Sequence, residues 1–104
     1  MKERKAARIQ PIRVPVSTPK LAVSLLKEFV KSADNNVPSV TVPGSKARWY
    51  SADTIVSWYL SNQNKYIHKG WLGRCLHAAI ESQMAGVRMS SVRSADGKSI
   101  NVYR

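Results

Sequence analysis

The chain contains a single cysteine, Cys75, among its 104 residues, so no disulfide can form within it. This excludes the disulfide-bonded scaffolds of small secreted proteins, and no cluster of cysteine and histidine has the spacing of a metal site. No apolar run approaches the roughly 18 residues that a membrane-spanning helix needs. The basic N-terminus also lacks the apolar segment of a signal peptide. We therefore expect a cytoplasmic protein with no bound metal, no cofactor and no membrane partner.

Acidic residues are scarce, which bears on catalysis. The six carboxylates belong to Glu3, Glu28, Asp34, Asp53, Glu81 and Asp96. They are scattered along the chain, and no two are placed as an acid–base pair or as ligands of one metal ion. There is no phosphate-binding glycine loop, and no serine or cysteine has a recognisable base beside it. The sequence therefore indicates a non-enzymatic protein with no catalytic residues and no small-molecule substrate.

Basic residues, by contrast, are abundant. The 17 lysines and arginines give a formal net charge of +11. Solubility alone needs a net charge of only about 2–8 in a small domain, and a field this strong attracts polyanions. A hydrophobic content of 43% is that of an ordinary globular chain, and the length suits one domain. The charge therefore favours a nucleic acid as partner over an acidic protein or an anionic membrane.

Residues 1–17 are predicted to form a flexible basic arm, and residues 18–104 to form one folded domain. Pro11 and Pro15 prevent a continuous helix in the arm and favour extended backbone. The arm could be a solvated tail, or it could order on phosphates or enter a minor groove. The arm cations that we expect to contact a nucleic acid are Arg4, Lys5 and Arg8.

Two helices are predicted from their start signals. Thr18 and Pro19 suit the N-cap and the first position of a helix that ends near Ser32. Ser51 suits the N-cap of a second helix, which ends in the polar run 61–64. The apolar positions recur at helical spacing in both segments. They are Ala22, Leu25, Leu26 and Phe29 in the first, and Ala52, Ile55, Val56, Tyr59 and Leu60 in the second.

The segments before and after the second helix are less regular. Residues 40–42 could form a short strand, and Lys46 and Arg48 place charge beside two aromatic residues that we assign to the core, Trp49 and Tyr50. After the second helix, the side chains of Tyr66 and Ile67 are predicted to pack in the core and so anchor the turn that contains them.

A third helix is predicted from Lys69 to about Ala85, with Gly86 as its C-cap. Its apolar face includes Cys75, which we interpret as a core thiol because free cysteine is often buried. The apolar face consists of Leu72, Cys75, Leu76, Ala79, Ile80 and Gln83. The opposite face consists of Gly70, Gly73, Arg74, His77, Ala78 and Glu81.

A β-hairpin is predicted after the third helix. Residues 88–93 and 99–103 alternate in polarity, and Asp96-Gly97 is a strong turn signal between them. Three apolar side chains of the hairpin are expected to cover the helices, namely Met89, Ile100 and Val102.

This order of elements resembles a winged helix-turn-helix domain. The most specific segments are the start of the third helix, Gly70-Trp71-Leu72-Gly73-Arg74-Cys75-Leu76, and the hairpin from Arg88 to Arg104. The pattern is similar to winged helices of phage and mobile-element replication initiators, primase-helicases and regulators. The resemblance covers residues 18–104 and implies an α+β, mainly helical fold, with three helices and a C-terminal β-hairpin wing.

The resemblance implies sequence-specific binding of double-stranded DNA, in origin recognition during replication initiation or in transcriptional regulation. It places the protein in a bacterial cell or a phage-infected host, at the nucleoid, with a homodimer or a larger replication assembly as further candidate partners. A recognition helix needs small residues for close approach to the major groove and polar side chains at base edges. The expected contacts are Lys69, Gly70, Gly73, Arg74 and His77 in the helix, Arg93, Ser94 and Lys98 in the wing, and Lys46 and Arg48.

Plainer interpretations stay open for several of these residues. Arg74 could pair with Glu81 or Asp53, and Gly73 could be a packing contact. Charges at the hairpin tip could simply block edge-to-edge aggregation.

Two rival functions also stay open. Exposed aromatic residues would favour single-stranded nucleic acid or RNA, although the aromatics mostly fall at core spacing. An exposed Trp58, which lies off the apolar stripe, would favour a protein-interaction or dimerisation module.

Overall fold

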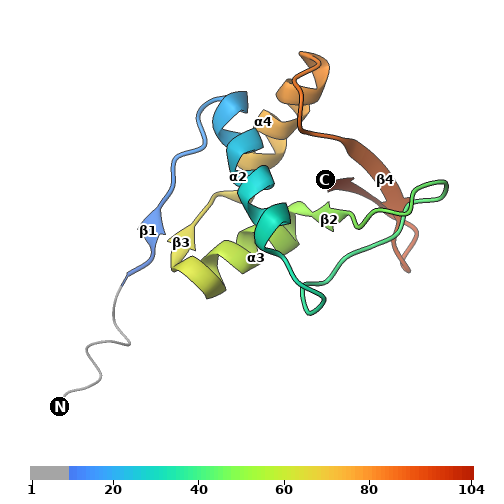
Figure 1. The fold of residues 1–104 in the computed structure, drawn as a ribbon, viewed down its shortest axis with the longest axis horizontal. Helices are drawn as coiled ribbons and strands as arrows, with labels where there is room; N and C mark the ends of the chain where they lie inside the picture. Colours follow the sequence, from blue (N-terminus) through green and yellow to red (C-terminus); the bar gives the residue numbers. More distant parts are fainter. Residues whose placement is uncertain (1–9) are drawn as a thin grey trace.

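A computed structural model describes residues 10–104 of the chain (Figure 1). The helices are α2 (Pro19–Ser32), α3 (Ala52–Gln63) and α4 (Lys69–Glu81). The strands are β1 (Ile12–Arg13), β2 (Tyr50–Ser51), β3 (Lys65–Tyr66), β4 (Met89–Arg93) and β5 (Ser99–Tyr103). These elements make a small α+β fold, so the predicted fold class is confirmed at that level. Within residues 10–104, no helix has the length and apolar character needed to cross a membrane.

The starts of α2 and α3 are set by the predicted N-caps. The Thr18 hydroxyl accepts a hydrogen bond from the backbone N–H of Leu21 at 3.2 Å, and Pro19 occupies the first helical turn. The Ser51 hydroxyl accepts from the backbone N–H of Thr54 at 3.2 Å. Each cap supplies an acceptor to one of the N–H groups that a helix start leaves unpaired, which confirms both predicted starts.

The end of α4 differs from the prediction. The helix stops at Glu81 instead of continuing to Ala85, and Gly86 is not its C-cap. Gln83 adopts a left-handed backbone with a φ of 57°, and the N–H of Met84 donates to the carbonyl of Ala79 at 3.0 Å. This is a Schellman ending, which most often uses glycine at the left-handed position. Because glutamine holds that position here, the sequence carried no glycine signal at the true end.

The three-stranded sheet has the order β2-β5-β4, with both pairings antiparallel. The hairpin formed by β4 and β5 lies to one side of the three helices (Figure 1). Val102 and Tyr103 are buried in the central strand, where they pair with strands on both sides. Ile100 and Val102 alternate with Tyr103 along β5, so they lie on the face of the sheet opposite to Tyr103 and Met89, which pack with the core. The prediction that Ile100 and Val102 cover the helices is therefore wrong, and Ile100 is 39% exposed. Met89 is half-buried at the base.

Of the predicted arm, the structure describes residues 10–17. Residues 10–17 dock on the helices, because β1 pairs in parallel with β3 and Val16 is buried in the core. The Cys75 thiol is buried as predicted and donates to the Val16 carbonyl oxygen at 3.6 Å. The arm residues Arg4, Lys5 and Arg8 lie outside the described residues.

The hydrophobic core lies between the helices and the inner face of the sheet. Its fully buried large side chains are Leu26, Phe29, Ile55, Tyr59, Ile67, Leu72 and Leu76. The Tyr59 hydroxyl donates to the Leu25 carbonyl oxygen at 2.6 Å, and burial, with the nearby charge of Glu28, raises the pKa of Tyr59 well above its ordinary value. Trp49 and Tyr50 are buried as predicted.

The structure differs from the sequence interpretation at Tyr66 and at residues 40–42, and it leaves Trp58 only partly exposed. Tyr66 is 38% exposed because β3 directs it outward, while its neighbour Ile67 is fully buried. Trp58 is half-buried, because its ring packs edge-on against Phe29 at 5.4 Å between centroids. Residues 40–42 make no strand and contribute one isolated bridge to Trp49.

Candidate nucleic-acid interface

The predicted recognition residues share one side of α4. Lys69, Gly70 and Arg74 are exposed, and Gly73 and His77 are half-buried. No acidic residue lies in the first turn of the helix. The positive end of the helix dipole therefore adds to the charge of the two cations.

The two cations of α4 differ in what they contact. The Lys69 ammonium lies 3.0 Å from the Asp53 carboxylate, which is the one ion pair within residues 10–104. Arg74 is not paired with Asp53 or Glu81, and its guanidinium lies 5.0 Å from the centre of the Trp71 ring. Such a surface ion pair contributes only about 0–1 kcal/mol, so Lys69 can exchange Asp53 for another anion at small cost.

The two glycines of α4 meet different neighbours. A Cβ at Gly70 would come within 3.1 Å of the His68 ring, which caps the helix by accepting from the Trp71 N–H at 3.2 Å. A Cβ at Gly73 would lie 3.9 Å from the Tyr103 hydroxyl, an ordinary contact distance. Gly70 therefore leaves room for the cap, whereas Gly73 is not required by packing.

His77 joins α4 to the central strand of the sheet. Its Nε2 lies 3.1 Å from the Asn101 side-chain nitrogen, and its ring faces the Tyr103 ring edge-on. Burial raises the pKa of Tyr103 above its ordinary value. The exposed side of α4 is therefore continuous with one face of β5.

The tip of the hairpin is ordered by its own hydrogen bonds. The Asp96 carboxylate accepts from the Ser94 hydroxyl and from the Lys98 backbone N–H, and these bonds lower the pKa of Asp96. Arg93 makes one long hydrogen bond to the Gly97 carbonyl oxygen at 3.5 Å. Lys98 is exposed. The tip therefore presents two cations on a turn that is held by its own hydrogen bonds.

Arg48 has a structural partner that sequence reasoning did not anticipate. Its guanidinium donates to the Asp34 carbonyl oxygen at 3.2 Å and to the Asn35 side chain. These bonds tie the segment before β2 to the turn after α2. Lys46 is exposed nearby in sequence. Arg48 is therefore already engaged, and Lys46 is the more available cation of the two.

A groove lies between residues 13–17 and the start of α4. Its volume is about 650 Å³, and its lining includes Arg13, Tyr66, His68 and Trp71. Trp71 is 51% exposed. The Arg13 guanidinium lies 5.7 Å from the centre of the Tyr66 ring. This combination of exposed aromatic rings and arginines was missed by sequence reasoning.

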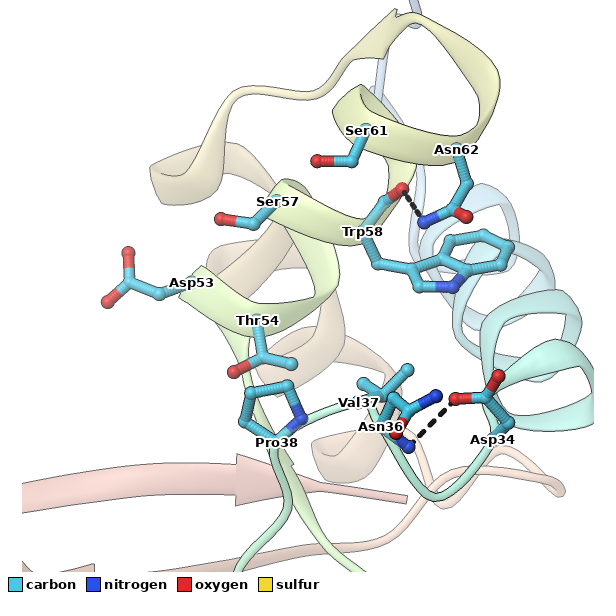
Figure 2. A pocket seen from close by; sticks show the side chains of 10 residues that line it. All are labelled: Asp34, Asn36, Val37, Pro38, Asp53, Thr54, Ser57, Trp58, Ser61 and Asn62. Atoms are coloured by element: carbon cyan, nitrogen blue, oxygen red, sulfur yellow. Dashed lines mark hydrogen bonds between the residues drawn. The ribbon is translucent and has the colours of Figure 1, made fainter.

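A second hollow, of about 470 Å³, lies between α3 and the turn after α2 (Figure 2). Its lining is polar and contains two carboxylates, Asp34 and Asp53, which Figure 2 shows on opposite sides. Trp58 extends from α3 toward α2 at its back. The hollow has no lysine or arginine in its lining, so it does not suit an anion.

Comparison of the chain with protein-family models, with curated proteins and with solved structures finds no match. The described residues also contain no group of three or more histidine, cysteine or acidic side chains that could hold a metal ion.

Proposed function

We propose that this protein is a winged helix-turn-helix domain that binds double-stranded DNA in a sequence-specific manner and has no enzymatic activity. One observation carries the proposal. The strand β2, which lies between α2 and α3 in the sequence, pairs with β5 of the hairpin that follows α4. This joins a three-helix unit to a β-hairpin wing in the order expected of that family. The connection between α3 and α4, residues 64–68, is longer than the simplest helix-turn-helix turn of about three to four residues.

The surface chemistry of α4 supports a major-groove contact. Lys69 and Arg74 are exposed at the start of the helix, and a helix of this length and diameter fits the groove. Gly73 leaves a small surface between these cations and His77. In this proposal Arg74 reads a base edge, and Lys69 leaves Asp53 for a phosphate.

The hairpin would then contact the DNA backbone beside the helix. Arg93 and Lys98 supply charge on a turn that needs little further ordering, so binding loses little conformational entropy there. Such contacts fix the register of the protein on the duplex without reading its sequence. Origin recognition and transcriptional regulation, alone or as a homodimer or part of a larger replication assembly, both fit this mode of binding.

The proposal is tested by titrating the full chain with labelled duplexes at two salt concentrations. We expect binding that weakens steeply with salt, because cations displace condensed counterions from DNA. Lys98→Ala should lower the slope of log K against log salt by about one unit, with similar losses on all sequences. Lys31→Ala, which removes a charge from the exposed end of α2, is the matched control and should leave the slope nearly unchanged. Binding that does not respond to salt, or equal effects of the two variants, would contradict the proposal.

A further inference from the structure

The groove beside α4 combines features that the duplex contact does not use. It runs along the docked segment of residues 13–17 on one side and the helix start at His68 and Trp71 on the other. At about 650 Å³ it falls in the size range of sites that hold small ligands or nucleobases, roughly 300–1,000 Å³. Figure 1 shows β1 and β3 side by side at this edge of the molecule.

The aromatic rings of the groove are available to a ligand. Trp71 is 51% exposed and Tyr66 is 38% exposed, whereas Trp49 is buried. Each exposed ring of the groove has a guanidinium over one face, Arg74 at 5.0 Å from the centre of Trp71 and Arg13 at 5.7 Å from the centre of Tyr66, so a base would stack on the other face or displace the arginine. An exposed ring with an adjacent arginine can stack on a base and hold the neighbouring phosphate.

The charge of the groove favours a polyanion over an apolar protein segment. Its lining contains no carboxylate, while Arg13 and His68 both line it. An apolar partner would bury the Arg13 guanidinium without pairing it, which is unfavourable. A strand of nucleic acid supplies phosphates for the arginines and flat bases for the rings.

From these observations we infer that the groove binds a single strand of DNA that leaves the duplex held by α4. The inference rests on the proposed function, since Arg74 stands at the border of the groove and of the duplex contact. One or two bases stack on Trp71 and Tyr66, and the phosphates between them lie near Arg13. The preferred substrate is therefore a junction between double-stranded and single-stranded DNA.

The test compares four labelled DNA probes with the full chain. These are a blunt duplex of about 16 base pairs, the same duplex with a tail of about six thymidines at the 5′ end of one strand, the same duplex with that tail at the 3′ end, and the tail sequence alone. One stacked base is worth about tenfold in affinity, so the tailed duplex should bind at least about tenfold more tightly than the blunt one. Binding should quench part of the tryptophan fluorescence.

Trp71→Leu isolates the contribution of the groove, because it keeps an apolar side chain at an exposed position and removes the large ring. It should abolish the advantage of the tail and the fluorescence change, and leave blunt-duplex affinity within about twofold. Leu60→Ala removes another exposed apolar side chain, on α3, and serves as the matched control. It should leave the affinities for all four probes unchanged.

The outcomes separate the two proposals. If the blunt duplex binds and neither tail increases affinity, the groove inference is overturned and the proposed function stands. If the tailed and single-stranded probes bind and the blunt duplex does not, the duplex contact fails while the groove is retained. If Trp71→Leu instead dissociates a dimer seen by sedimentation, without changing the effect of the tail, the groove is an interface between copies and the inference is overturned.

Discussion

The two hollows of this molecule differ both in charge and in how their tryptophans are held. The groove beside α4 is lined by Arg13 and His68 and has no carboxylate, whereas the hollow beside α3 contains Asp34 and Asp53 and no lysine or arginine. Both hollows contain one tryptophan. A polyanion approaching this surface is therefore attracted to one hollow and repelled by the other.

The two tryptophans show how position determines whether a ring serves stability or binding. Trp58 packs edge-on against Phe29 at 5.4 Å and Tyr59 at 4.9 Å, in contact with the core. Trp71 contacts the exposed side chain of Arg74 and is itself 51% exposed. The comparison indicates that Trp58 contributes to folding and that Trp71 is available to a ligand.

Replacing each tryptophan by alanine should give the largest contrast. Trp58→Ala should lower the free energy of unfolding by about 2–3 kcal/mol, because it leaves a gap beside Phe29 and Tyr59. Trp71→Ala should change it by less than about 0.5 kcal/mol, because an exposed side chain buries little on folding. Urea unfolding followed by circular dichroism measures both values. Similar losses in the two variants would remove the distinction between the hollows.

Arg74 tests the groove side of the comparison. Arg74→Ala should weaken duplex binding by about 1–3 kcal/mol and relax the preference at one base position, if the guanidinium reads a base edge. Lys31→Ala removes the same charge from the end of α2 and should have a much smaller effect. Competition binding with a set of single-base variants of a selected duplex measures the change. An equal loss on every sequence would mean that Arg74 contacts phosphate only.

The hydroxyl of Tyr59, whose ring packs against Trp58, tests how much the core side of the comparison contributes to stability. Tyr59→Phe should lower the free energy of unfolding by about 1 kcal/mol, because it removes the hydrogen bond to the Leu25 carbonyl oxygen. The folded-state pKa of Tyr59 is raised, so its contribution is fully present below about pH 10, the ordinary tyrosine pKa, and is lost as the pH rises further. Urea unfolding at several alkaline pH values should show a shallower decline in the variant. If the free energy of unfolding declined with pH as steeply in the variant as in the parent protein, Tyr59 would not be the cause of the decline.

The acids of the second hollow should give the smallest effects. Asp53→Asn releases Lys69 and should raise duplex affinity about two- to fourfold at low salt, since a surface ion pair contributes under about 1 kcal/mol. Asp34→Asn should change affinity less than twofold at about 0.15 M salt, where exposed charges beyond roughly 8 Å are screened. Fluorescence anisotropy at two salt concentrations compares them. A larger effect of Asp34→Asn than of Asp53→Asn would indicate that DNA binds nearer to Asp34 than to Lys69.

The features predictable from sequence depend on chemistry between near neighbours. Thr18 and Ser51 cap their helices through bonds three residues away, and Asp96-Gly97 closes a turn of adjacent residues. The apolar stripe by which α4 packs on the core was also predictable from the helical spacing of its apolar residues. Trp71 lies off that stripe and three residues before Arg74, so its exposure could have been inferred from the same spacing.

The features that were missed depend on distant or unusual partners. The strands β1 and β3 have two residues each, and their paired residues are more than 50 positions apart in the sequence. A strand of two residues is too short to show a periodic pattern. The same pairing creates the groove and directs Tyr66 outward. The left-handed Gln83 likewise had no composition signal, because most residues that end helices in this way are glycine.

The central strand of the sheet comes after every other element in the sequence. Tyr50 of β2 and Met89 of β4 both find their backbone partner in Tyr103. During synthesis, the three helices therefore emerge before the strand that pairs with β2 and β4 is available. Until it is made, Trp49 and Tyr50 lack the cover that they have in the finished fold. The segment around Trp49 and Tyr50 is accordingly more open to proteases and chaperones before β5 is made than after it has paired.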